Sequence, residues 1–372
     1  MLTNSKFQIP NSKFLQMRIV VAMSGGVDSS VAAALLADQG HEVIGVSMQL
    51  YDQTEGVTSF GSCCSIDDLH DARRVAAAIG IPHYIVNFER QFQDHVVSNF
   101  VREYTAGRTP LPCAHCNSDL KFATLLDRAQ AFGADAVATG HYARAGRDPA
   151  SGRFWLGRGA DARKDQSYFL FSLTQTQLAH AIFPVGDRPK EDVRDYARAR
   201  RLPVADKPDS QEICFIPDHD YAGFVDRHAA RTTHDGAIVD EQGRVLGRHD
   251  GIHRFTVGQR KGLGLGASSA GAPMYVLALR PAEREVVVGH RGALERTTLS
   301  ASGVNWIGGA PADSVRAAVQ IRHRHYPAPA TVRSTGDGRA EVVFDAPQIA
   351  VTPGQAVVFY DGDLVMGGGW ID

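Results

Sequence analysis

Five cysteines carry much of the chemical potential of this chain, and their spacing is uneven. Cys63 and Cys64 are adjacent, Cys113 and Cys116 form a CxxC pair, and Cys214 stands alone far downstream. So few cysteines in a chain of 372 residues do not make a disulfide framework and indicate reduced thiols used for chemistry or metal binding. A structural zinc site needs two further ligands, and the sequence holds no second CxxC. Reactive thiols are therefore the stronger interpretation.

A second chemical element is the sequence SGGVDSS at residues 24–30. It follows an apolar run over 18–23 and precedes an alanine-rich stretch, which predicts a buried strand, a loop and a helix in that order. Glycines let a ligand approach the main chain, and the N–H groups and dipole of a helix N-terminus favour an anion. The Gly-Lys-Ser/Thr of a Walker A loop is absent. The pattern predicts a different polyphosphate loop, with a plain glycine turn as the weaker alternative.

The CxxC pair belongs to the segment GRTPLPCAHCN, residues 107–117. Its two prolines favour extended backbone, and Asn117 suits the N-cap of a helix over 117–132. Cys116 would then lie at a helix N-terminus, where the dipole lowers the pKa of a thiol. Cys214 has an apolar residue on each side, which is typical of a core cysteine, but the polar stretch before it favours a thiol presented to a cleft.

The elements that must position these residues alternate between strand and helix in the first half of the chain. Apolar runs that predict strands are separated by stretches with helical spacing, and they lie at 18–23, 42–48, 83–88 and 135–140. This alternation predicts an α/β fold with a doubly wound parallel sheet, whose ligands lie beyond the carboxyl ends of the strands. From about residue 293, short strands with turn signals and no helix predict a small closed β-barrel.

The chain exceeds the length at which one core usually keeps growing, so two or three domains are expected. We predict a flexible N-terminal tail, a catalytic domain, a small mixed domain and a C-terminal β-barrel domain, at residues 1–16, 17–212, 213–292 and 293–372. Met17 directly precedes the first strand and is an alternative start of the chain.

The net charge of -2 means that a polyanionic partner must be met by local basic patches, such as Arg322–Tyr326 on a predicted barrel strand. No apolar run reaches the length of a membrane span, and the first sixteen residues lack the pattern of a secretory leader. We therefore expect a cytoplasmic protein without a membrane partner.

Seven ordered blocks carry a resemblance to a known family. SGGVDSS resembles the pyrophosphate-binding loop of the PP-loop ATP pyrophosphatases, which split ATP between its α and β phosphates. With GRTP followed by CNxxxKF, GHY, KDQSYFL at 164–170, DSxxICFI, GQRKGLG at 258–264 and TPGQ at 352–355, the chain is similar to the tRNA-specific 2-thiouridylases. The resemblance runs from about Met17 to the C-terminus. It implies thiolation of the wobble uridine of tRNA, an ATP-binding domain over 17–212 and a tRNA-binding domain over 213–292.

The resemblance also implies roles for individual positions. Cys116 resembles the catalytic cysteine, and Cys214 resembles the cysteine that carries sulfur as a persulfide. The ATP site is implied at Ala22, Met23, Ser24, Gly25, Gly26, Val27, Asp28, Ser29, Met48 and Gly140, and contact with the target base at Leu111, Pro112 and Cys113. Contact with tRNA is implied at His141, Lys164, Asp165, Gln166, Arg322, His323 and Gln355. Asp28 is our candidate for organising Mg²⁺, and Asp119 and His141 are candidate general bases.

Two routes for the sulfur stay open. In the first, Cys214 holds a persulfide, and Cys116 either attacks it to release sulfide or resolves the product as a Cys116–Cys214 disulfide that a cellular reductant reopens. The second follows from a departure from the family pattern, because Cys113 stands where some members have an aspartate. Three thiols at Cys113, Cys116 and Cys214 would suit a [4Fe-4S] cluster that hands over sulfide. Cys63 and Cys64 are expected to be inert.

The expected partners are the anticodon region of tRNA and a protein that donates persulfide sulfur, and the expected cofactor is ATP with Mg²⁺. Two other functions share some of these features. A PP-loop synthetase that forms amides from ammonia would use the same nucleotide loop but would not need Cys116 or Cys214. An RNA-binding scaffold that retains a nucleotide is the remaining alternative.

Overall fold

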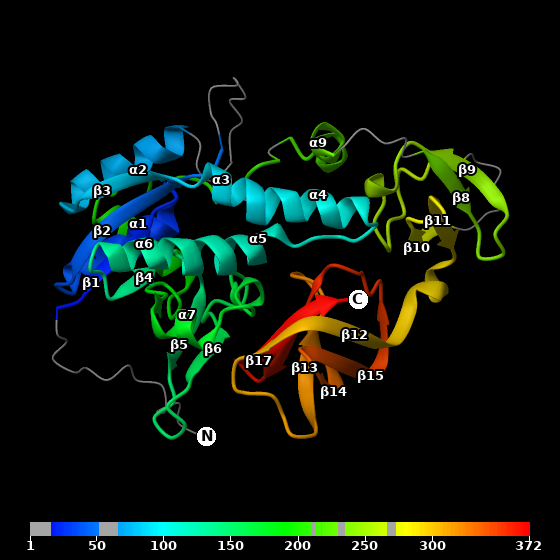
Figure 1. The fold of residues 1–372 in the computed structure, drawn as a ribbon. Helices are drawn as coiled ribbons and strands as arrows, with labels where there is room; N and C mark the ends of the chain where they lie inside the picture. Colours follow the sequence, from blue (N-terminus) through cyan, green and yellow to red (C-terminus); the bar gives the residue numbers. More distant parts are fainter. Residues whose placement is uncertain (1–15, 52–65, 210–212, 217, 230–234, 266–272) are drawn as a thin grey trace.

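The computed structural model describes residues 16–51, 66–209, 213–216, 218–229, 235–265 and 273–372. Cys63, Cys64, Met1, the rest of the predicted tail as far as residue 15, and residues 210–212 of the DSxxICFI block lie outside the described residues. Figure 1 shows an α/β region, a small sheet at the end of a helical hairpin, and a barrel beneath that hairpin.

The α/β region is built on a parallel sheet, as predicted. Within the described residues the sheet has five strands in the order β3-β2-β1-β4-β7, and each neighbouring pair is parallel. The strands are β1 (Arg18–Ala22), β2 (Glu42–Gln49), β3 (His83–Asn87), β4 (Ala136–Ala138) and β7 (Ala181–Ile182). Because strand order reverses beside β1, the crevice at its carboxyl end is the expected ligand site.

Helices cover both faces of this sheet. Alternate residues of β1 point to opposite sides, so Ile19 and Val21 pack in one apolar cluster while Val20 and Ala22 pack in another. The first cluster includes side chains of α1 (Val27–Asp38), α2 (Ile66–Ile79) and α8 (Lys190–Ala199). The doubly wound α/β arrangement predicted from the sequence is therefore confirmed.

The second face is covered by a hairpin of two long helical runs. The first consists of α3 (Glu89–Phe92), the π-helical η1 (Gln93–Val97) and α4 (Ser98–Thr105), and the second of α5 (Pro112–His115), the π-helical η2 (Cys116–Thr124) and α6 (Leu125–Ala131). Figure 1 shows α4 reaching away from the sheet toward the small β-domain.

The predicted start of the second run was wrong. The helix begins at Pro112 and not at Asn117, because proline lacks only an N–H that the first turn of a helix does not use. Cys116 therefore lies one turn inside the run, at the first residue of the π-helical segment. The helix N-terminus that was expected to lower the pKa of the Cys116 thiol lies instead at Pro112.

Two β-structures follow. The small sheet has the order β10-β11-β8-β9, in which β8 and β9 form a hairpin around Gly243. The barrel is a ring of six described strands in the order β12-β15-β14-β13-β16-β17, closed by pairing of β12 with β17. The bounds are β8 (Gly236–Val239), β9 (Val245–His249), β10 (Tyr275–Arg280), β11 (Glu285–Gly289), β12 (Glu295–Trp306), β13 (Ser314–Gln320), β14 (Ala328–Gly336), β15 (Arg339–Ile349), β16 (Ala356–Asp361) and β17 (Leu364–Ile371).

The barrel is joined to the α/β region by a hairpin that the sequence did not reveal. The strands β5 (Ala143–Arg147) and β6 (Phe154–Arg158) extend the barrel sheet through pairing of β6 with β17. Arg322 begins a turn after β13 and is not in a strand, contrary to prediction. The remaining described elements are η3 (Ser167–Phe169), α7 (Gln175–Ala179), α9 (Tyr221–His228), η4 (Ile252–Arg254) and η5 (Arg291–Leu294).

None of the helices in the described ranges is long and apolar enough to cross a membrane.

Candidate active site

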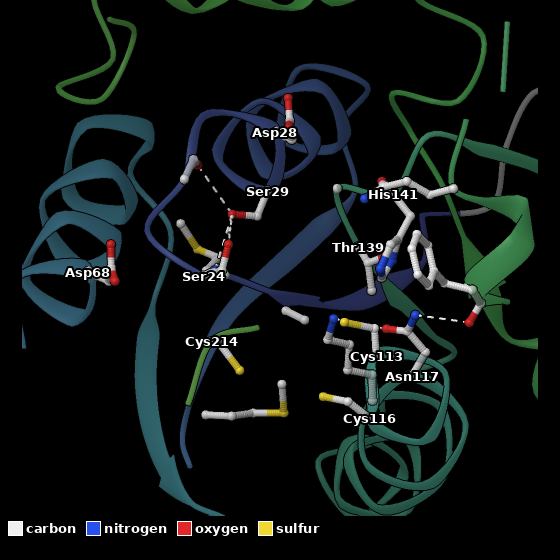
Figure 2. Close-up of a pocket in the computed structure, with 18 of the residues that line it drawn as sticks. Ser24, Asp28, Ser29, Asp68, Cys113, Cys116, Asn117, Thr139, His141 and Cys214 are labelled. Carbon is white, nitrogen blue, oxygen red and sulfur yellow. Dashed lines mark hydrogen bonds between the residues drawn. The ribbon is translucent and has the colours of Figure 1, made fainter. Parts of the chain in front are cut away.

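A cavity of about 370 Å³ opens at the carboxyl ends of the central strands. Its wall includes Ala22 at the end of β1, Met48 near the end of β2 and Thr139 directly after β4. The loop after β1, the start of the second helical run and the segment before Cys214 complete it. Figure 2 shows Cys113 and Cys116 on one side and Cys214 on the other, below the loop that carries Ser24.

The loop between β1 and α1 has the geometry of a phosphate cradle. Gly25 has a φ of +73°, and a Cβ on it would lie 2.2 Å from the Asp68 carbonyl oxygen, so only glycine fits there. Gly26 caps α1 without a side-chain hydrogen bond, which leaves the N–H groups of the first turn available to an anion. The Ser29 hydroxyl accepts a hydrogen bond from Ser24 N at 3.2 Å and fixes the loop.

The Asp28 carboxylate is held by a buried cation behind this loop. The Lys190 ammonium donates to its two oxygens at 2.7 and 2.8 Å, and the Tyr142 hydroxyl donates at 2.8 Å. Lys190 is only 7% exposed. Burial, together with the adjacent Asp28 carboxylate, raises the pKa of Tyr142. Asp28 lines the cavity, so its role toward Mg²⁺ stays a prediction that would require Lys190 to share this carboxylate.

The structure brings the two predicted catalytic cysteines to one cavity. Cys116 and Cys214 both line it together with Ser24 and Asp28, and both thiols lie outside disulfides. Cys214 is partly buried against the core, where the neighbouring ring of Phe215 packs between aromatic side chains of the first helical run. The chemistry of the thiols and the binding of a polyphosphate can therefore take place in the same space.

Cys113 lines this cavity as well and is exposed. However, across the described ranges no group of three or more His, Cys, Asp or Glu side chains is placed to hold a metal ion. The three thiols are not assembled as a ligand set for an iron–sulfur cluster in this conformation.

The pKa of each candidate general base is lowered, not raised. Desolvation opposes the Asp119 carboxylate, but hydrogen bonds from His115 and Ser118 outweigh it and lower the pKa of Asp119. His141 lines the cavity, and burial lowers its pKa well below the ordinary value, with the Lys121 charge acting in the same direction. His141 is the better placed of the two and is neutral at pH 7, with its Nδ1 2.7 Å from the Thr139 hydroxyl.

Leu111 and the predicted tRNA contacts divide into two groups. His141, Lys164 and Gln166 line the cavity, and the ring of His323 lies 4.5 Å from that of Phe169 in the cavity wall. The other residues lie outside the cavity lining: Leu111, which precedes α5; Asp165, which accepts a hydrogen bond from Arg158 at 2.7 Å; Arg322, which donates to the Ile349 carbonyl at 3.1 Å; and Gln355, which donates to the Thr109 carbonyl at 3.0 Å.

The Gln355 contact is one of several contacts between the barrel and the segment before Cys116. None of these contacts was predicted from the sequence. The Thr109 N–H donates to the Pro353 carbonyl at 2.8 Å, and the rings of His115 and Trp370 stack with centroids 4.6 Å apart. No local sequence signal predicts these contacts, because their partners are separated by more than half of the chain.

Gly140 lies directly against the nucleotide loop, and its replacement gives a first prediction. A Cβ on Gly140 would lie 2.5 Å from Ser29 N and 2.6 Å from the Asp28 carbonyl carbon, both main-chain atoms. We expect Gly140→Ala to displace the loop and raise the Kd for ATP about tenfold or more, as measured by calorimetric titration. Gly308→Ala is the control, because a Cβ there meets nothing within 4 Å. Equal Kd values for ATP in both variants would show that the close approach of Gly140 to the nucleotide loop is not required for ATP binding.

In the sequence, Asp209 stands out only as the first residue of the DSxxICFI block. In the structure it is the centre of a charge network. Lys164 and Arg194 each donate to its carboxylate at 2.7 Å, and the Lys190 ammonium lies 2.8 Å away. Desolvation opposes the ionised form, but the hydrogen bonds from Lys164 and Lys190 prevail and lower the pKa of Asp209 to about 2.

This shift predicts acid sensitivity. Because the pKa of Asp209 is lower in the folded than in the unfolded chain, its interactions stabilise the fold above about pH 4, and this contribution is lost as the pH falls toward about 2. Asp209→Asn should flatten the fall in the free energy of unfolding over that window, as measured by urea denaturation. Asp206→Asn is the matched control, since Asp206 is 81% exposed. If the free energy of unfolding of Asp209→Asn falls with pH as steeply as that of the wild type, Asp209 does not contribute to the acid sensitivity.

Comparisons with known proteins identify the family. Residues 17–218 match the family described as tRNA methyl transferase HUP domain, residues 222–290 its PRC-barrel domain, and residues 296–371 the aminomethyltransferase beta-barrel domain. Among solved structures, a 4-thiouridine synthetase in complex with RNA and ATP matches 57% of this chain and 53% of its own at 16% identity, with a TM-score of 0.33, which is too low to support an argument.

Curated relatives are much more similar. The tRNA-specific 2-thiouridylase MnmA of Geotalea uraniireducens is 53% identical over 368 residues, which cover 98% of this chain and 96% of the relative. The protein of the same name from Solibacter usitatus is 54% identical over 370 residues, covering 95% of this chain and 99% of the relative. The chain therefore belongs to the tRNA-specific 2-thiouridylase family.

Proposed function

We propose that this protein uses ATP to replace the oxygen on carbon 2 of the wobble uridine of tRNA with sulfur. The observation that carries the proposal is the cavity in which the SGGVDSS loop, Cys116 and Cys214 line one space. The names of the curated relatives support the substrate and the reaction. Because the reacting atom must reach this cavity, the uridine has to leave the base stack of the anticodon loop.

The first step activates the base. The uridine oxygen attacks the α phosphate of ATP, and pyrophosphate leaves from the cradle formed by the loop between β1 and α1. The N–H groups at the start of α1 stabilise the charge that develops on the leaving phosphates. The adenylated oxygen is then a good leaving group.

The second step transfers sulfur. The terminal sulfur of a persulfide on Cys214 adds to carbon 2, and AMP departs with the original oxygen. The Cys116 thiolate then attacks the Cys214 sulfur and breaks the sulfur–sulfur bond, so that the transferred sulfur keeps the electron pair and remains on the base. The product is a Cys116–Cys214 disulfide, which a dithiol reductant reopens. A partner protein that carries a persulfide reloads Cys214.

The cluster route is the second candidate mechanism for the same reaction. It is favoured by the three thiols that line the cavity and opposed by their placement, which does not form a ligand set among the described residues. We therefore route no step through it. If protein purified without oxygen carries iron and the visible absorption of a cluster, and loses activity when the iron is removed, the persulfide route is wrong.

The function is tested by product analysis. The protein is incubated with Mg²⁺, ATP, a persulfide donor and unmodified tRNA, and the digested RNA is analysed by mass. We expect 2-thiouridine and AMP in equal amounts, both dependent on tRNA. AMP formation with incorporation of nitrogen from ammonia would instead identify an amide-forming synthetase, and absence of AMP formation would identify a binding protein.

A further inference from the structure

A short stretch next to the sulfur-carrying segment is tied to the nucleotide loop at two points. The Lys207 ammonium donates to the Gly25 carbonyl of the loop at 3.1 Å, and to Asp68 and Asp71 of α2 at 2.6 and 2.7 Å. Two residues later, Asp209 is held by the three cations already described. We call these contacts of Lys207 and Asp209 the 207–209 clasp.

Each carboxylate of the clasp already has a cationic partner before any substrate binds. The ion pairs around it join the carboxylates of Asp28, Asp68, Asp71 and Asp209 to Lys164, Lys190, Arg194 and Lys207, and Asp71 also pairs with Arg74 at 3.2 Å. Most of these groups are largely shielded from water, where an uncompensated charge is costly. A polyphosphate placed beside the loop is a further anion that competes with these carboxylates for the cations within its reach.

The cavity wall shows which cations can change partner. Lys164 and Lys207 line the cavity with the loop, while Lys190 and Arg194 are not part of its lining. Phosphates in the cradle therefore compete for Lys207 with Asp68 and Asp71, and for Lys164 with Asp209. Lys190 and Arg194 can continue to hold Asp209.

We propose that Lys207 is a positioning residue that exchanges its carboxylate partners for nucleotide phosphate and thereby couples phosphate binding to the exposure of Cys214. This inference rests on the proposed function only in taking Cys214 as the sulfur carrier. Lys207 is suited to this because it touches the loop, lines the cavity together with Cys214 and precedes Cys214 by seven residues in the sequence. Because coupling of this kind is reciprocal, the state with Cys214 exposed binds phosphate more tightly by the same factor by which phosphate favours that state.

The coupling is measured through the reactivity of Cys214. The full chain is treated with N-ethylmaleimide with and without saturating Mg²⁺-pyrophosphate, and the labelling of Cys113 and Cys214 is followed separately by peptide mass spectrometry. We expect pyrophosphate to speed the labelling of wild-type Cys214 about fivefold or more. Lys207→Met should remove this response at saturating pyrophosphate, and Lys207→Arg, which keeps the charge, should retain it.

Two further variants keep the test decisive if Lys207→Met folds poorly. Asp209→Asn should label quickly even without pyrophosphate, because one anchor of the clasp is lost. Asp206→Asn, next to Lys207 but paired at the surface with Arg198, should behave as wild type. An unchanged pyrophosphate response in Lys207→Met, or no response in wild-type protein that binds pyrophosphate by calorimetry, overturns the coupling. Failure of the product assay with an intact labelling response would instead overturn the proposed function.

Discussion

Cys116→Ser and Cys214→Ser are each expected to lower tRNA thiolation on the order of a thousandfold or more. A serine at 214 cannot carry a persulfide, and a serine at 116 cannot break the bond between the two sulfurs. Both thiols line the cavity, but neither is needed for the attack of the uridine on ATP. Single-turnover assays with radiolabelled sulfur measure the loss, and release of pyrophosphate with tRNA should persist.

Cys113→Ser is the matched control for these variants, because Cys113 is a third thiol in the same cavity wall. The persulfide route gives Cys113 no covalent role, so this variant should keep most of the activity. Loss of activity in Cys113→Ser equal to that in the other two would contradict the persulfide route and favour a cluster held by all three. Full activity in Cys116→Ser and Cys214→Ser would remove thiol chemistry altogether.

Asp28→Ala is expected to lower tRNA-dependent pyrophosphate release about a hundredfold or more. The carboxylate lies in the first turn of α1 and accepts hydrogen bonds from Lys190 and Tyr142, so its loss both changes the charge at the phosphate cradle and leaves Lys190 with one partner fewer. Asp28→Asn separates these effects, since an amide keeps the size of the side chain. Pyrophosphate release is followed with a coupled phosphate assay.

Asp38→Asn tests whether any acid of this helix has the same effect. Asp38 is at the last turn of α1, 42% exposed and paired with Arg200, so its replacement should leave pyrophosphate release unchanged. Equal losses in Asp28→Asn and Asp38→Asn would show that helix stability, and not the carboxylate at the loop, controls the reaction.

The sequence predicted the parts of this molecule that depend on local pattern. The apolar run over 18–23 predicted β1 to within one residue, and the loop chemistry of SGGVDSS follows from side-chain types alone. The start of the helix at Pro112 was missed because proline was interpreted as a breaker, although it is favourable in a first turn. The role of Lys190 and the 207–209 clasp were not predicted, because opposite charges from α1, α8 and the segment before Cys214 meet only after folding.

The position of β12 likewise depends on contacts that form only in the fold. Most of its first seven residues are exposed, so no clear apolar alternation marks its beginning. Its place is fixed instead by pairing with β15 and β17 on either side. Closure of the barrel therefore fixes the position of this strand, which its own residues do not specify.

The stacking of Trp370 on His115 has a consequence for biosynthesis. The residues that support the start of the Cys116 helix, including the Ile371 carbonyl that accepts a hydrogen bond from Arg108 at 3.0 Å, are added by the ribosome only after the whole α/β region. During translation the α/β region can emerge and fold well before this support exists. A nascent polypeptide that stops short of the end of β17 therefore lacks this anchor of the Cys116 helix, and we expect it to bind nucleotide before it can carry out sulfur chemistry.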